Sequence, residues 1–305
     1  MSAITATDYE LVTERAGLLR RERGLIELGG AEAAEFLQGQ VTNDIEALVP
    51  GTGCYAALLT HKGRIRADMR VLRTDDGLLV DTEPIGHTIL WKTIQTYSLG
   101  RQVTSADQTD ALTVVSLLGP GAREALGVDP GHEEHSHVMG PAGRVVATDL
   151  GVDIICPTGE VDALIQSLGI PQVSEDTAEC LRIEAGRPRL GFDVGGETIP
   201  EEAGLNARAV SFTKGCYVGQ ETVARLHYKG RPNRHLRGLL LSEPATAGDA
   251  VISGDREVGS VGSSCVSPLR GPIALAILRR EVEPGDEVAV GDSSASAKVC
   301  DLPFG

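Results

Sequence analysis

From about Arg237 onward, the chain consists of short apolar runs separated by turn-forming residues. Each run is too short for a stable helix and is bounded by Pro, Gly or polar residues, which is typical of a small all-β barrel. The expected strands are residues 238–241, 250–252, 258–265, 273–278, 287–290 and 297–300. We therefore predict a region of residues 1–236 and a C-terminal antiparallel β-barrel of residues 237–305.

The region before the barrel contains two β-turn-α units of similar design. Residues 25–28 read as a strand that leads through Gly29-Gly30 into a short helix, and residues 114–118 lead in the same way through Gly119-Pro120-Gly121. Glycines supply the turn in both units. This pattern predicts an α+β fold with two related lobes, split near residues 105–110.

The sequence predicts a hairpin between these units, with strands at residues 53–60 and 64–73. Successive side chains of a strand point to opposite faces, so Asp68 shares a face with Arg66 and Arg70. Neighbouring cations favour the charged form of a carboxyl, and we therefore expect Asp68 to be ionised. Pairing with a ligand amine and an ordinary surface salt bridge both fit this position.

Composition limits the classes of partner. The 305 residues carry a formal charge of −15, which disfavours nucleic acid and anionic membranes as general partners. The N-terminal residues resemble no secretion signal, so we expect a cytoplasmic protein. The six cysteines form no C-x-x-C pair, and we expect free thiols in a reducing compartment.

Residues 214–221, KGCYVGQE, place one cysteine between two glycines and two positions after a lysine. A cation beside the sulfur favours thiolate, so Lys214 is expected to activate Cys216. Thiolate could serve covalent chemistry, redox chemistry or a metallocluster. A lone cysteine is equally often a small buried core residue, and spacing alone leaves both interpretations open.

Together with Arg225, this segment resembles the K-G-C-[FY]-x-G-Q-E-x-x-x-R pattern of the YgfZ family. Residues 36–44, parts of 181–206 and parts of 261–278 are similar to elements of the wider superfamily that includes the glycine-cleavage T-proteins. The resemblance therefore spans nearly the whole chain. It implies two α+β lobes and a β-barrel in a ring around an opening that holds tetrahydrofolate.

The resemblance also implies a function. YgfZ-type proteins support synthesis or repair of iron–sulfur clusters in client enzymes in a folate-dependent way, and the motif cysteine is required. Folate and transient iron–sulfur client proteins are the implied partners, with Cys216 as the working thiol. Whether that thiol handles a cluster, a persulfide or a client disulfide is left open.

Candidate folate ligands follow from the same resemblance. The pterin edge needs a carboxylate or amide, and the glutamate tail needs cations. The candidates are Asp68, Asp153, Glu184, Arg187, Gln220 and Arg225. A solvent-facing position for Glu184 and a helix-terminal cation at Arg187 are the alternatives.

The rival function is aminomethyl transfer. T-proteins carry a G-G-x-x-D-D element, whereas residues 63–68 read GRIRAD, so Ala67 stands in place of one acid. This difference favours a non-transferase function. If the chain is an enzyme, folate-dependent one-carbon transfer is the class that the resemblance implies.

Two further segments carry concentrated charge or histidine. Residues 225–237 contain five basic side chains and no acid, which fits a solvated linker, a docking site for an acidic client or a site for a polyglutamate tail. The segment 132–137 contains three histidines, but its spacing is poor for a metal. We expect an exposed loop there and no metal site.

Overall fold

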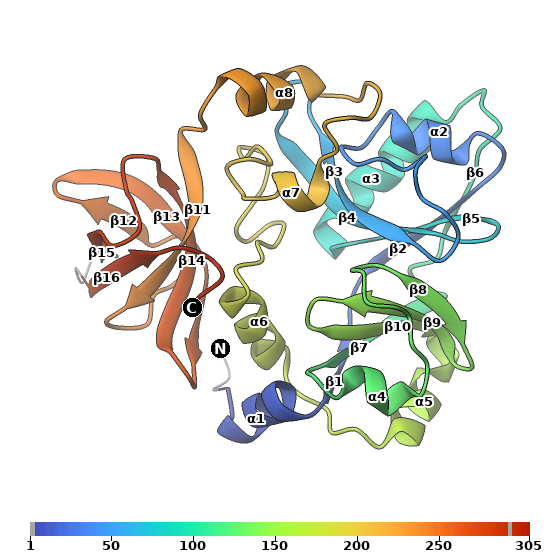
Figure 1. Cartoon of the computed structure of the whole chain (residues 1–305), viewed down its shortest axis with the longest axis horizontal. Coiled ribbons are helices and arrows are strands. Elements are labelled where there is room, and N and C mark those ends of the chain that lie inside the picture. Colours follow the sequence, from blue (N-terminus) through green and yellow to red (C-terminus); the bar gives the residue numbers. More distant parts are fainter. Residues whose placement is uncertain (1–3, 292–294) are drawn as a thin grey trace. The chain divides into compact units, whose positions relative to one another are not determined.

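The computed structural model describes residues 4–291 and 295–305. The chain forms two compact units (Figure 1). The sheet unit comprises Glu10–Val173 and Asn206–Gln220. The barrel unit comprises residues 4–9, Ser174–Leu205 and Glu221–Gly305. The predicted boundary at residues 236 and 237 stays a prediction.

The first sheet of the sheet unit has five antiparallel strands in the order β3-β4-β5-β2-β6. A short helix connects β2 to β3, and a longer helix connects β5 to β6. Pro84 begins the longer helix at a position where a missing N–H costs no hydrogen bond. The bounds are β2 Gly24–Gly29, α2 Ala33–Gln38, β3 Gly53–Leu59, β4 Ile65–Arg73, β5 Gly77–Thr82, α3 Pro84–Tyr97 and β6 Thr104–Asp107.

The second sheet has the order β1-β7-β10-β9-β8. It also has five strands, and β7 pairs with both β1 and β10. Helix α4 follows β7, and a 3-10 turn with helix α5 follows β10. The bounds are β1 Gly17–Arg21, β7 Leu112–Leu118, α4 Ala122–Leu126, β8 His137–Gly140, β9 Gly143–Thr148, β10 Gly151–Pro157, η1 Thr158–Glu160 and α5 Val161–Leu168.

The two sheets share one topology. Read from its β8 edge, the second sheet repeats the first: a three-strand meander, then the strand that precedes the meander in sequence, then an edge strand. Gly30 and Gly119 directly follow the equivalent strands β2 and β7, with φ of 98° and 109°. A Cβ at Gly30 would lie 2.2 Å from the Gln102 carbonyl oxygen, and only glycine avoids that clash. The prediction of two related α+β lobes is confirmed.

A common hydrophobic cluster joins the two sheets. Leu25, Leu72 and Leu79 of the first sheet pack with Val114, Val146 and Ile155 of the second. These side chains are at most 8% exposed. Burial of this apolar surface holds the two sheets as one unit and fixes the polar side chains at their junction.

Helix α6, Glu175–Glu184, belongs to the barrel unit. The Ser174 hydroxyl accepts a hydrogen bond from the Thr177 amide, and Gly186 follows the helix with φ of 67°. A serine N-cap and a glycine of positive φ after the last turn are the residues that favour the start and the end of a helix. The remaining helices are α1 Ala6–Glu14, α7 Asn206–Ala209 and α8 Gln220–Lys229.

The C-terminal strands form a closed barrel in the order β11-β14-β13-β12-β15-β16, as predicted. Its interior is filled by aliphatic side chains such as Leu239, Val251 and Leu278, which are fully buried. Closure leaves no free strand edge. The bounds are β11 Arg234–Leu241, β12 Ala250–Ser253, β13 Arg256–Ser267, β14 Gly271–Arg279, β15 Glu287–Val290 and β16 Ala295–Cys300.

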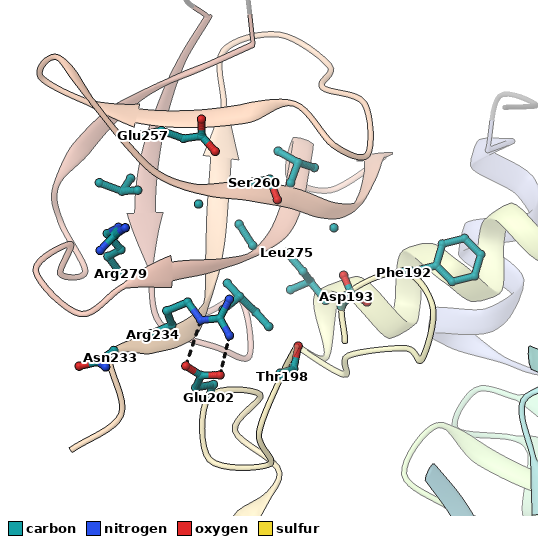
Figure 2. Close-up of a pocket in the computed structure, with 16 residues that line it drawn as sticks. Phe192, Asp193, Thr198, Glu202, Asn233, Arg234, Glu257, Ser260, Leu275 and Arg279 are labelled. Carbon is teal, nitrogen blue, oxygen red and sulfur yellow. Dashed lines mark hydrogen bonds and ion pairs between the residues drawn. The ribbon is translucent and has the colours of Figure 1, made fainter. Parts of the chain in front are cut away.

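A cavity of about 610 Å³ lies at the outer wall of this barrel (Figure 2). Strands β11, β13 and β14 line one side, and the segment from Phe192 to Glu202 lines the other. The bidentate pair of Arg234 and Glu202 closes its lower edge in that view, with distances of 3.0 and 2.9 Å. In the described part of the chain, no helix is both long and apolar enough to span a bilayer.

Candidate functional site

The cysteine motif forms a loop of the sheet unit between α7 and α8. Cys216 is an exposed free thiol at this loop. Lys214, two residues earlier, is only 8% exposed. The loop therefore presents its thiol to solvent while its lysine points into the protein.

The Lys214 ammonium donates to three backbone carbonyls, those of Gln38, Val41 and Asn43, at 2.6, 2.7 and 2.8 Å. It also lies 5.1 Å from the centre of the Tyr217 ring. Burial lowers the pKa of Lys214 to about 8, against the opposing effect of the nearby Asp44 carboxylate. In the structure Lys214 anchors the motif to the segment after α2, and activation of Cys216 by this cation stays a prediction.

The two motif glycines have different roles. Gly219 has a φ of 87°, and a Cβ there would lie 2.5 Å from the Thr60 carbonyl oxygen. At Gly215, a Cβ would meet no atom within 4 Å. The backbone at Gly219 therefore lies so close to the β3–β4 hairpin that a side chain would not fit, whereas no neighbouring atom requires a glycine at position 215.

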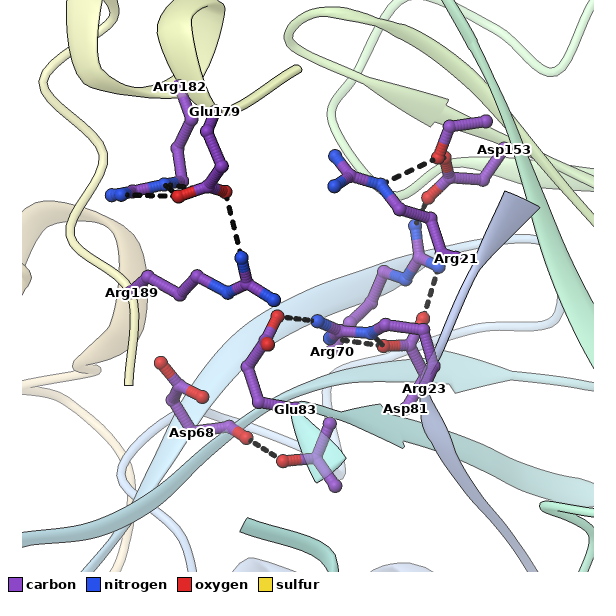
Figure 3. A network of polar contacts seen from close by, with 12 residues as sticks. Arg21, Arg23, Asp68, Arg70, Asp81, Glu83, Asp153, Glu179, Arg182 and Arg189 are labelled. Carbon is purple, nitrogen blue, oxygen red and sulfur yellow. Dashed lines mark hydrogen bonds and ion pairs between the residues drawn. The ribbon is translucent and has the colours of Figure 1, made fainter. Parts of the chain in front are cut away.

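The polar centre of the sheet unit is a network of arginines and carboxylates (Figure 3). Asp81 on β5 accepts from Arg23 at 2.5 Å and also pairs with Arg70 on β4. Arg23 also pairs with Glu83. Burial alone would raise the pKa of Asp81, but the two guanidinium groups outweigh burial and lower the pKa to about 2.

Asp153 on β10 is part of this network. Its Oδ2 accepts from Arg70 at 2.7 Å, and its Oδ1 accepts from the Ser116 hydroxyl at 2.6 Å. Both oxygens of this predicted pterin ligand therefore have a protein donor. To accept a pterin N–H, Asp153 would have to share an oxygen with Arg70 or Ser116.

Asp68 lies on β4 and is 4% exposed, so the alternative of a surface salt bridge is wrong. Its Oδ2 accepts from the Tyr55 hydroxyl at 2.5 Å. Arg70, one of the two arginines expected to hold Asp68 ionised, pairs with Asp81 and Asp153 instead. Burial raises the pKa of Asp68, against the opposing effects of Tyr55 and Arg23.

Arg208 on α7 completes this part of the site. Its guanidinium lies 5.0 Å from the centre of the Tyr55 ring and pairs with Glu134. No sequence motif marked Arg208 or Tyr55 as a candidate site residue. The sequence signal that could have identified Arg208 is its position between residues 181–206, parts of which resemble the superfamily, and the cysteine motif.

The histidine segment differs from the expected exposed loop. His135 and His137 are 7% and 5% exposed. Burial, followed by nearby Arg70 for His135 and Arg144 for His137, lowers the pKa of each to about 4. His137 is held by Arg144 at 2.8 Å. No group of three or more potential metal-ligating side chains is present in residues 4–291 and 295–305.

Arg70 and His135 contain three buried nitrogen atoms that make no hydrogen bond within the described chain. They are Arg70 Nε and both ring nitrogens of His135. Buried polar atoms normally have partners. Together with Asp68, they offer donors and acceptors of the kind that a pterin edge requires. This cluster is the part of the sheet unit whose chemistry best fits a folate.

Glu184 and Arg187 belong to the barrel unit. The Glu184 carboxylate accepts from the hydroxyls of Tyr9 at 2.9 Å and Ser267 at 2.5 Å, so a solvent-facing position is wrong. Arg187 is half-buried, and its amide donates to the Arg182 carbonyl at 3.1 Å. Figure 3 shows the adjacent pairing of Arg182 with Glu179. Folate binding by either residue stays a prediction.

The last two candidates lie on α8. Gln220 is its first residue and is half-buried, and its amide donates to the Tyr217 carbonyl at 3.3 Å. Arg225 lies in the same helix and is exposed. Their folate-binding roles also stay predictions.

Fold and site together define a protein of the T-protein class. Residues 1–131 match the GCVT N-terminal domain, and residues 234–304 match the glycine cleavage T-protein C-terminal barrel domain. The aminomethyltransferase T of Bartonella henselae has the same fold, with a TM-score of 0.89 over 98% of this chain and 89% of that one at 22% identity.

Relatives by sequence narrow the class. The tRNA-modifying protein YgfZ of Sodalis glossinidius is 29% identical over 92% of this chain and 90% of its own length. The YgfZ of Colwellia psychrerythraea is 29% identical over 75% and 74%, respectively. An aminomethyltransferase of Rubrobacter xylanophilus is 26% identical over 97% and 85%. The chain belongs to the YgfZ/GcvT superfamily.

Proposed function

We propose that this protein binds tetrahydrofolate and supports synthesis or repair of iron–sulfur clusters in client enzymes, with Cys216 as the working thiol. The observation that carries the proposal is the exposure of Cys216 on a loop held by buried Lys214. An exposed thiol on an anchored loop can meet a client protein, whereas a buried one cannot. Free thiols at all six cysteines fit a reducing compartment such as the cytoplasm.

Tetrahydrofolate is assigned to the polar cluster of the sheet unit. Asp68 and the Arg70–His135 group would hold the pterin edge, because Arg70 and His135 have buried nitrogens without a hydrogen-bond partner and Asp68 offers a buried carboxyl group. Asp153 would orient Arg70. When bound, the cofactor supplies one-carbon chemistry. Glu184, Arg187, Gln220 and Arg225 stay candidate contacts for the remainder of the folate.

The printed name of the YgfZ relatives refers to tRNA modification. For this chain we attribute any such link to a client enzyme rather than to direct RNA binding. A net charge of −15 repels a polyanion at the distances over which charges act in solution.

Calorimetric titration with tetrahydrofolate tests the cofactor assignment. Binding heat that is lost in Asp68→Ala, with the fold retained, supports it. A lack of heat and of thermal shift at high ligand concentration would instead leave a scaffold that acts through protein contacts alone. The client role is tested separately, by replacing Cys216 with Ala in cells that lack their own copy and measuring client activity.

Aminomethyl transfer is the second candidate, favoured by one observation. The raised pKa of Asp68 moves this carboxyl toward the range of a general base, as a transferase would require. Ala67, in place of an acid, opposes it. Release of ammonia and methylenetetrahydrofolate from an aminomethyl-loaded lipoyl carrier protein would establish this activity, and its absence with bound folate would exclude it.

A further inference from the structure

Besides Lys298 on β16, five exposed basic side chains of the barrel unit have no acidic partner among the residues that the structure describes. We refer to these five residues as the basic strip. They are Arg225 and Lys229 on α8, Arg231 in the segment leading to β11, and Arg279 and Arg280 at the end of β14.

The backbone brings the members of the basic strip together. Arg225 and Lys229 are four residues apart on one helix and therefore share a face. Strand β11 pairs with β14 so that Arg234 lies opposite Arg279. The Arg280 amide donates to the Asn233 carbonyl at 2.9 Å. The end of β14 thus lies beside the segment that contains Arg231.

The other two basic residues of residues 225–237 are already neutralised. Arg234 forms the bidentate pair with Glu202, and Arg237 lies 3.3 Å from Asp301. Arg225, Lys229 and Arg231, the members of the basic strip within this segment, are therefore the ones whose positive charge is available to a partner. On a chain of net charge −15, such an area directs oppositely charged partners to one place.

The strip borders the cavity of the barrel wall. Figure 2 shows Arg279, Arg234 and Asn233 along the same side of that cavity. Two of the cavity's carboxylates are compensated, Asp193 by Arg182 at 2.9 Å and Glu202 by Arg234. Glu257 is exposed and, among the described residues lining the cavity, is the carboxylate without a partner.

We propose that the basic strip is a docking surface for an acidic polypeptide segment of a partner protein. A short segment can place its carboxylates on the strip and keep clear of the acidic remainder of the chain. A nucleic acid would extend its charge over that remainder and be repelled. The proposal does not depend on the function of Cys216.

Fluorescence anisotropy of a short dye-labelled oligoglutamate peptide tests the proposal on the full chain. We expect binding at low ionic strength that weakens at about 0.15 M salt. The double variant Lys229→Gln/Arg231→Gln should bind about fivefold more weakly, since it removes two surface charge pairs. Glu257→Gln should bind more tightly, because it removes a repelling carboxylate.

The matched control is Lys92→Gln/Lys298→Gln, which makes the same change in net charge at two exposed lysines elsewhere. Its affinity for the peptide should equal that of the unchanged protein. No binding at low ionic strength, an equal loss in both double variants, or tighter binding of a tRNA competitor at the strip would each overturn the proposal. Client activity is a separate measurement, so a failure here would leave the proposed function intact.

Discussion

Arg70 on β4 donates to Asp153 on β10 at 2.7 Å and thereby links the two sheets of the sheet unit. The side chains are 8% and 14% exposed, and Arg70 also pairs with buried Asp81. The polar centre of the proposed folate site is thus also the junction of two topologically equivalent sheets. Changes at this junction should affect stability and ligand binding together.

Replacing Arg70 by Met should lower the free energy of unfolding by about 3 kcal/mol, because it leaves Asp153 without its cation and buried Asp81 with Arg23 alone. Urea denaturation measures this change. The control is Arg101→Met, whose 41% exposed guanidinium pairs with Glu32 and Glu35 and should cost less than about 1 kcal/mol. Equal losses in the two variants would show that the network does not stabilise the junction.

Lys214→Met should destabilise the protein by about 2 kcal/mol, because the carbonyls of Gln38, Val41 and Asn43 lose their donor in a buried setting. The loop should also become more sensitive to proteolysis near residues 211–219. Lys92→Met, at an exposed position, serves as the control and should change stability by less than about 0.5 kcal/mol. An unaltered cleavage pattern in Lys214→Met would contradict the anchoring role.

The two motif glycines give a matched pair of substitutions. Gly219→Ala should cost more than about 1 kcal/mol, since φ is 87° and the Cβ would clash with the Thr60 carbonyl. Gly215→Ala meets open space and should change stability by less than about 0.5 kcal/mol. Thermal unfolding of both variants decides the point, and the reverse order of melting temperatures would refute this account of the loop.

Stability should fall as the pH drops from about 6.5 to about 4. His135 and His137 have folded pKa values of about 4, so in this window the unfolded chain binds protons that the folded chain does not. Each histidine can contribute about 3 kcal/mol at most. Asp68 has the opposite effect on stability at pH values just above the ordinary pKa of an aspartate, because its pKa in the folded chain is raised. Asp81, whose folded pKa is about 2, affects stability only at lower pH.

Urea unfolding at a series of pH values measures this dependence. The double variant His135→Asn/His137→Asn should flatten the curve between pH 6.5 and 4, and asparagine tolerates the φ of 71° at His135. Replacing exposed His61 by Asn should leave the slope unchanged. An unchanged slope in the double variant would exclude the two histidines as its cause.

Much of the fold could be predicted because its signals are local. The six barrel strands follow from apolar runs and turn residues, and closure agrees with their number and spacing. Gly30 and Gly119 indicate the turns of the two β-turn-α units, because glycine readily adopts the positive φ that these turns require. The two ends of α6 also carry local signals, an N-cap serine at Ser174 and a glycine at position 186 after the last turn.

The partners within the site could not be predicted, because they depend on distant segments. Arg70 shares a strand face with Asp68 in the sequence pattern, but its guanidinium reaches Asp81 and Asp153 on two other strands. Arg208 reaches Tyr55 and Glu134 from the far end of the sheet unit's sequence. The polar composition of residues 132–137 predicted an exposed loop, but tertiary packing buries His135.

The most direct test of the proposed function is client activity in cells that lack their own copy of this protein. Client iron–sulfur enzymes should lose activity with Cys216→Ala, while Cys300→Ala, a control at a half-buried thiol, should restore it fully. Equal amounts of both variants and equal melting temperatures exclude misfolding as the cause. Full client activity with Cys216→Ala would contradict the assignment of Cys216 as the working thiol.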